Sequence, residues 1–65
     1  MQYKRRGYAF EYQLLREAKN DLWVADGYLI SDPSLGTRTK TFKTEREAAL
    51  AFMDWAKEIA GRRKR

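Results

Sequence analysis

The sequence predicts an α+β fold in which one C-terminal helix covers one face of a three-stranded antiparallel sheet, in the order βββα. Two strand-like segments, a turn followed by a short third strand, and a capped amphipathic segment support this prediction. A chain of 65 residues has room for one small domain with a thin core. The predicted organisation is a basic N-terminal arm at 1–7, the βββα domain at 8–61 and a basic C-terminal tail at 62–65.

The first strand is predicted at 8–17, where YAFEYQLL alternates aromatic and leucine side chains with smaller or polar ones. This period of two residues is typical of a half-buried strand. The polar cluster REAKND separates it from a second strand, predicted at 22–31 and rich in β-branched and aromatic residues. The two segments therefore predict two strands joined by a polar turn.

The second strand has two largely apolar faces, and we expect the face that carries Trp23 to be buried. Ala25 and Gly27 share that face, and their small size lets a helix approach the sheet closely. The opposite face of the sheet has no predicted partner within the chain. It is expected to expose Val24, Tyr28 and Ile30.

A turn is predicted at SDPSLG, because Asp32 can hydrogen-bond its own backbone, Pro33 fixes φ and Gly36 accepts a positive φ. The third strand then occupies 37–42, where threonines alternate with basic residues until Phe42. The pattern leaves open which face of this strand is buried.

The helix is predicted at 45–60. Thr44 is placed as its N-cap, Glu47 completes a capping box, and Gly61 is placed to end the helix in a left-handed cap. One stripe of the helix is apolar and is assigned to the core. Its central residues are Ala48, Phe52, Trp55, Ala56 and Ile59.

The net charge of +5 comes from the two ends of the chain. Between Gly7 and Gly61 there are seven basic and nine acidic residues, so the predicted domain is itself slightly acidic. Basic ends of this kind can contact an anionic surface or keep a small domain soluble, and both interpretations stay open.

Three stretches, RGYAFEY, LWVADGYLI and TFKTEREAALAFMDWAKEIAG, carry a resemblance that spans nearly the whole chain. They resemble a group of small bacterial single-domain proteins with a Gly-Tyr start, a Trp on the middle strand and an F-x-T-x-x-E-A stretch where the helix begins. The resemblance implies the βββα fold and a bacterial or phage origin. It implies no activity, because that group looks like a family without an established function.

A second resemblance rests on DPSLGTR followed by TFKTEREAALAF. These stretches are similar to the AP2-type and integrase N-terminal DNA-binding domains, which are also βββα and read the major groove with the sheet. The similarity implies DNA binding. Arg38, which matches the arginine after the glycine in those domains, is the one DNA contact that it transfers.

Catalysis and metal binding are not expected. The chain contains no histidine and no cysteine, and it has no glycine-rich phosphate loop. Asp26 and Asp32 are explained by their strand and turn positions. We therefore expect no enzyme, cofactor, metal or small-molecule substrate. The lack of cysteine and of a long apolar run predicts a cytoplasmic protein that does not associate with a membrane.

The sequence favours a non-enzymatic module that binds nucleic acid, most readily DNA, through its basic arms and third strand. The alternative is a protein-interaction or homodimerisation module that uses an edge strand or the uncovered face with Val24, Tyr28 and Ile30. The acidic body favours this alternative, whereas the basic ends favour nucleic acid. The predicted nucleic-acid contacts are Lys4, Arg5, Arg6, Arg38, Lys40, Lys43, Arg62, Arg63, Lys64 and Arg65.

Overall fold

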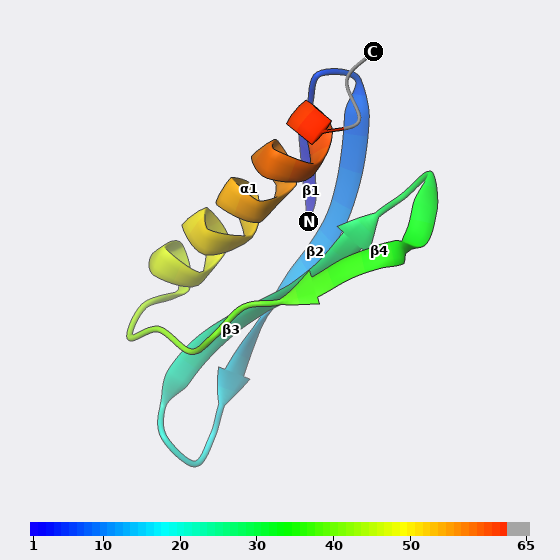
Figure 1. Cartoon of the computed structure of the whole chain (residues 1–65). Helices are drawn as coiled ribbons and strands as arrows, with labels where there is room; N and C mark the ends of the chain where they lie inside the picture. The colour runs from blue at the N-terminus through cyan, green and yellow to red at the C-terminus, as the bar shows by residue number, and fades with distance from the viewer. Residues whose placement is uncertain (63–65) are drawn as a thin grey trace.

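The structure is a computed structural model that describes residues 1–62, and it shows helix α1 lying across one face of an antiparallel sheet (Figure 1). The strands follow one another as a meander, in the order β1-β2-β3-β4. The α+β fold with a C-terminal helix is confirmed, but the prediction of three strands is wrong because the sheet has four. The elements are β1 Gln2–Arg5, β2 Tyr8–Glu17, β3 Leu22–Leu29, β4 Asp32–Arg38 and α1 Glu45–Arg62.

The additional strand is β1, which lies within the residues that the sequence assigns to a basic arm, 1–7. It pairs with β2 so that Tyr3 lies opposite Phe10. Met1 extends the pairing, since its carbonyl accepts the Tyr12 N–H at 2.9 Å and its amine donates to the Tyr12 carbonyl at 2.9 Å. Tyr3 packs against the core, whereas the other three residues of β1 are exposed. A strand with one apolar residue leaves almost no periodic signal.

The predicted third strand at 37–42 is largely wrong, because β4 begins at Asp32, inside the predicted turn, and ends at Arg38. The turn itself comprises residues 30–31. β4 pairs Leu29 with Asp32 but Tyr28 with Gly36, so that residues 33–35 form a bulge on an edge strand. A bulge tolerates proline because a bulged residue need not donate a backbone N–H to the neighbouring strand.

After β4 the chain stays beside β3 without forming a regular strand. Thr39 donates its N–H to the Ala25 carbonyl at 2.8 Å, and its hydroxyl accepts the Ala25 N–H at 3.0 Å. Phe42 and Trp23 exchange two backbone hydrogen bonds of 2.7 Å. These bonds cover the outer edge of β3 up to the loop that leads into α1.

The Trp23 face of β3 is turned towards the helix, as predicted. Trp23 itself is half-buried against the core. A Cβ added to Gly27 would lie 2.7 Å from Cε1 of Phe52, so the glycine is what allows the phenylalanine ring to come this close. That ring stacks on Tyr12 with a centroid distance of 4.8 Å. The fully buried residues of this face of β3 are Ala25 and Leu29.

Helix α1 confirms the predicted helix and extends it by two residues. The Thr44 hydroxyl accepts the backbone N–H of Glu47 at 3.2 Å, which is the predicted N-cap. Gly61 lies inside the last turn instead of ending it, and an Arg62–Glu58 ion pair of 3.1 Å supports that turn. Within residues 1–62 no helix combines the length and the apolarity that a membrane crossing requires. The buried residues of α1 are Ala48, Phe52, Ala56 and Ala60.

The molecule is elongated, with extents of 42 × 17 × 16 Å. Figure 1 shows the reason: the β2–β3 turn reaches past the start of α1, while the β1–β2 turn lies at the other end, beside the last turn of the helix. The β1–β2 and β2–β3 turns therefore mark opposite ends of the molecule.

Candidate nucleic-acid interface

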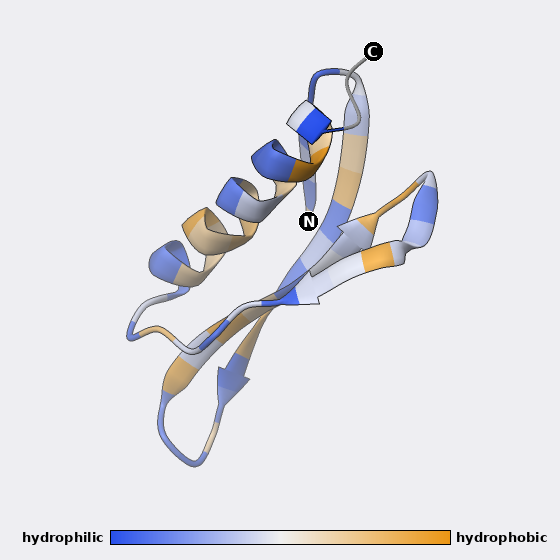
Figure 2. Ribbon diagram, in the orientation of Figure 1, coloured by the Kyte–Doolittle hydropathy of each residue, from blue (hydrophilic) through white to orange (hydrophobic). Residues whose placement is uncertain are grey.

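The β1–β2 turn presents three consecutive basic residues at one end of the molecule, in a stretch that Figure 2 shows as hydrophilic. Lys4 and Arg5 end β1 and Tyr8 begins β2, so Arg6 and Gly7 alone form the loop. Both loop residues have positive φ, 51° and 84°, as a two-residue type I′ hairpin turn requires. All three basic residues are exposed.

No carboxylate of the described chain is paired with these cations. The first acidic residue in the sequence is Glu11. The cross-strand partners are uncharged, with Ala9 opposite Lys4 and Tyr8 opposite Arg5. The turn therefore carries a local excess of three positive charges. The ion pairs found among residues 1–62 involve instead Met1, Arg16, Arg38 and Arg62.

The same hairpin forms a hollow of about 460 Å³, lined by residues 4–9. The three cations share this lining with Tyr8, a half-buried residue that also packs against the core. The hollow is wide open to solvent, so it is a depression of the surface rather than an enclosed ligand site. Arg5 lies opposite Tyr8 and shares its face of the hairpin, whereas Lys4 projects to the other face, so the three cations surround the turn and suit an anionic surface.

The end of α1 adds a fourth basic residue to this end of the molecule. The last turn of α1 lies beside the β1–β2 turn (Figure 1), and Arg62 is its final residue. The Arg62 guanidinium donates to the Glu58 carboxylate at 3.1 Å, so its charge is partly compensated. The other predicted contacts of the tail, Arg63, Lys64 and Arg65, lie outside the described residues.

The remaining predicted contacts lie elsewhere. Arg38 ends β4, and its guanidinium donates to the Asp26 carboxylate at 3.1 Å. Lys40 and Lys43 belong to the segment that leads into α1, and the Lys40 ammonium lies 5.9 Å from the ring centroid of Phe42. Because the 18 residues of α1 span about 27 Å, the lysines and the β1–β2 turn lie near opposite ends of the helix. The predicted contacts therefore do not form one continuous surface.

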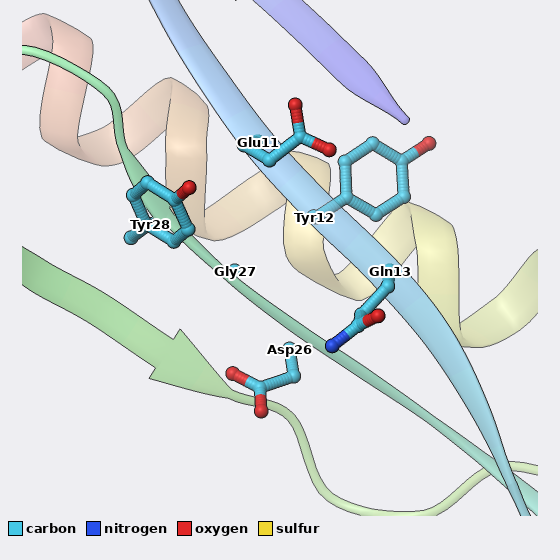
Figure 3. Close-up of a pocket in the computed structure, with 6 residues that line it drawn as sticks. All are labelled: Glu11, Tyr12, Gln13, Asp26, Gly27 and Tyr28. Atoms are coloured by element: carbon cyan, nitrogen blue, oxygen red, sulfur yellow. The ribbon is translucent and has the colours of Figure 1, made fainter.

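The open face of the sheet, defined as the face that α1 does not cover, carries two carboxylates at its centre (Figure 3). Two of its carboxylates, Glu11 and Asp26, border a second hollow of about 430 Å³ together with Gln13 and Tyr28. The Glu11 carboxylate is paired with the Met1 amine at 3.0 Å and that of Asp26 with Arg38. Because both carboxylates are paired with cations, the centre of the open face has no excess of positive charge that would attract the phosphates of a duplex.

Two of the three residues predicted to form an apolar interface are exposed, Tyr28 in β3 and Ile30 in the turn after β3. Tyr28 and Ile30 are 40% and 41% exposed, whereas Val24 is only 6% exposed. Val24 lies opposite Leu15 in the β2–β3 ladder. Its burial removes it from the surface and reduces the apolar patch to two side chains.

Sequence reasoning missed Gly7 and Tyr8 as parts of the basic hollow, because both lie at the boundary between the predicted arm and the predicted domain. One local signal was available: the alternation begins at Tyr8 directly after Arg6 and Gly7, which leaves room for a two-residue turn and a preceding strand. A metal site is not an alternative within residues 1–62, because no three acidic, histidine or cysteine side chains lie together there.

Comparisons with known proteins return no match for this chain. No family model matches the sequence, and neither the curated proteins nor the solved structures contain a significant match. The two resemblances described above therefore stay predictions, and the function proposed below rests on the chemistry of the site.

Proposed function

We propose that the chain is a small DNA-binding module that contacts backbone phosphates with its basic end, defined as Lys4, Arg5, Arg6 and Arg62. The observation that carries the proposal is the uncompensated charge of the β1–β2 turn. Its three basic residues are exposed, and the cross-strand partners of Lys4 and Arg5 are the uncharged residues Ala9 and Tyr8. Clustered cations that neutralise phosphates release condensed counterions, and this release drives non-specific DNA binding.

The proposal concerns phosphate contacts and not base recognition by the sheet. Lysine and arginine side chains on phosphates fix position and carry no sequence information. At the centre of the open face the charges of Glu11 and Asp26 are balanced by those of Met1 and Arg38, so this face offers duplex phosphates no excess of positive charge. We therefore expect binding that depends strongly on salt and weakly on DNA sequence.

The test compares two triple variants with the same net charge. Lys4→Gln/Arg5→Gln/Arg6→Gln removes the turn cations, and Lys19→Gln/Arg46→Gln/Lys57→Gln removes three exposed cations from other surfaces. Each variant lowers the net charge from +5 to +2. Binding is measured by fluorescence anisotropy on labelled DNA between about 50 and 200 mM salt.

The turn variant should bind more weakly than the control variant at every salt concentration. The slope of log affinity against log salt should become less steep by roughly 0.7–0.9 for each phosphate that the variant no longer neutralises, with at most three phosphates at stake. Far-UV circular dichroism and thermal melting check that both variants are folded. Equal slopes for the two variants would show that only the overall charge matters and would overturn the proposal.

Protein–protein association through the open face is the second candidate, and exposed Tyr28 and Ile30 are the observation that favours it. Two exposed side chains are a small patch compared with the contiguous apolar areas that mark interfaces. Sedimentation of the unmodified chain at rising concentration, with and without DNA, separates the candidates. A dimer that forms without DNA and is lost on Tyr28→Ser substitution would favour this second function.

A further inference from the structure

We infer that the free edge of β1 takes up an extended acidic strand of another protein, which adds to the sheet beside β1. The inference goes beyond the proposed function, because it concerns backbone groups of the sheet and a protein partner. The feature behind it is the juxtaposition, at one edge of the sheet, of outward-pointing backbone groups and the uncompensated cations of the β1–β2 turn.

The hydrogen-bond pattern of the β1–β2 ladder shows which backbone groups of β1 point outwards. The Met1 carbonyl accepts the N–H of its partner in β2 at 2.9 Å. Hydrogen-bonded and non-hydrogen-bonded pairs alternate along an antiparallel ladder, so Tyr3 and Arg5 also bond to β2. The N–H and C=O groups of Gln2 and Lys4 therefore point away from β2, to the side where the sheet ends.

The opposite edge of the sheet is protected against a further strand, whereas the edge of β1 is not. β4 carries the bulge at residues 33–35, which includes a proline. β1 has neither a proline nor a bulge, and it pairs with β2 in a regular register. Helix α1 packs mainly on β3, an inner strand, and does not replace a strand beside β1. Bulges and prolines are features that keep an edge strand from pairing, so β1 is the edge that remains able to pair.

The charges beside this edge determine which kind of strand can add to it. Lys4 and Arg5 end β1 and Arg6 follows, and no carboxylate of the described chain is paired with them. Pairing with β1 of a second copy would bring two such sets of cations onto one short ladder, and like charges on facing strands destabilise it. Acidic residues opposite Lys4 and Arg5 would form cross-strand ion pairs instead. The cations therefore disfavour self-pairing and select an acidic partner.

The register of β1 also specifies the pattern of the partner strand. Antiparallel pairing is the more stable arrangement, and it runs the partner from Arg5 towards Gln2. Its first two residues, opposite Arg5 and Lys4, are then acidic. The third lies opposite Tyr3, which is half-buried against the core, so an apolar side chain fits there. In such strand addition the backbone bonds supply affinity and the alternating side chains supply specificity.

The probe is a labelled, acetylated peptide in which two glutamates are followed by valine, threonine and valine. Its binding to the unmodified chain is measured by fluorescence anisotropy at about 50 mM salt. We expect saturable binding that weakens about 10-fold when glutamines replace both glutamates. The variant Lys4→Gln/Arg5→Gln/Arg6→Gln should weaken binding to a similar extent. The matched control Lys19→Gln/Arg46→Gln/Lys57→Gln, with the same net charge, should leave it unchanged.

Methylation of single peptide nitrogens separates strand addition from attraction by charge. A methyl group on the nitrogen of the residue opposite Lys4 removes a donor that strand addition requires, and it should weaken binding by about 10-fold. The same methyl group on the residue opposite Arg5 points away from β1 and should change the affinity by less than about 2-fold. Hydrogen exchange of the unmodified chain provides a second measurement. The amides of Gln2 and Lys4 should exchange readily in the free chain and become protected when the peptide binds.

The outcomes that would overturn the inference are distinct from those that concern DNA. Equal effects of the two methyl positions, or no protection of Gln2 and Lys4 at saturation, would show attraction by charge alone. Protection of these amides in a dimer formed without peptide would show that a second copy occupies the edge. A peptide that does not bind would overturn the inference and leave the proposed phosphate contacts standing. Strand addition with no DNA binding would support the inference and overturn the proposed function.

Discussion

The two hairpin turns at opposite ends of the molecule are both exposed and both charged, yet only one of them is internally neutralised. In the β2–β3 turn, the Arg16 guanidinium pairs with the Asp21 carboxylate, and Asn20 donates to the Glu17 carboxylate at 3.1 Å. In the β1–β2 turn, residues 4–6 contribute three cations, and the described chain offers them no carboxylate.

This difference indicates what the charges of each turn do. Solubility requires exposed charge, but acidic residues increase it more than basic ones, so it does not call for three neighbouring cations in one turn. Three neighbouring cations repel one another, and that repulsion is relieved when an anion binds. The β1–β2 turn therefore has the charge arrangement of a contact surface, whereas the β2–β3 turn has that of a solvated surface.

The largest expected effect comes from a change in the core. Because β2 is a strand of both hairpins, a disrupted core affects both turns. Gly27→Ala would place a methyl group 2.7 Å from Cε1 of Phe52 and against the backbone of β2. We expect the free energy of unfolding to fall by about 3 kcal/mol, measured by urea titration with tryptophan fluorescence.

The control for this prediction is a glycine with open space around it. A Cβ at Gly61 meets nothing within 4 Å, so Gly61→Ala in the last turn of α1 should stabilise the helix by up to about 1 kcal/mol. If both variants unfolded at the same urea concentration as the unmodified chain, β3 and α1 would not be packed as closely as described.

Smaller effects are expected where the backbone of each turn adopts positive φ. At Gly7, where φ is 84°, an added Cβ has no neighbour within 4 Å, so Gly7→Ala should cost only the backbone strain, about 1–2 kcal/mol. At Asp21, where φ is 58°, Asp21→Gly relieves strain but removes the partner of Arg16. Its expected net effect lies within about 0.5 kcal/mol of zero.

Thermal melting of the two variants tests this difference. If Gly7→Ala melted at the same temperature as Asp21→Gly, the stability of the β1–β2 turn would not depend on its tight two-residue geometry. DNA binding by Gly7→Ala should weaken as well, since the cations of the turn would no longer be held in fixed positions.

Local signals in the sequence predicted the elements that fold by local rules. The helix follows from the Thr44 cap and the apolar stripe, and β2 follows from its strict alternation, so the structure reproduces both. The buried face of β3 was predicted as well, because only small residues such as Gly27 allow a helix to approach the sheet.

The elements that were missed owe their structure to pairing with neighbours. β1 has a single apolar residue, Tyr3, and becomes a strand because β2 offers it an edge. β4 contains Pro33 and Gly36, which are typical of turns, but the bulge on an edge strand accommodates them. The basic hollow was missed for the same reason: its cations were predicted as contacts, but only the hairpin brings them together with Tyr8.

The smallest effects on stability, and the sharpest test of the comparison, come from exchanging the charge arrangements of the two turns. Ala9→Glu places a carboxylate opposite Lys4, which gives the β1–β2 turn an internal partner. Asp21→Asn removes the carboxylate that pairs with Arg16. Both changes concern ion pairs at the surface. In the existing pair, the Arg16 and Asp21 side chains are 60% and 71% exposed, so each change should alter the free energy of unfolding by less than about 1 kcal/mol.

DNA binding should respond very differently to the two changes, although each alters the net charge by one unit. Ala9→Glu lowers it from +5 to +4 and should weaken binding several-fold. The salt slope should fall by roughly 0.7–0.9, because Lys4 then pairs with the new carboxylate instead of a phosphate. Asp21→Asn raises it from +5 to +6 and should leave the affinity within about 2-fold, because the freed Arg16 lies near the end of β2, beside the β2–β3 turn at the far end of the molecule. If affinity instead rose with Asp21→Asn as much as it fell with Ala9→Glu, binding would follow total charge, and the position of the cations would carry no function. An effect confined to Ala9→Glu places the contact at the β1–β2 turn.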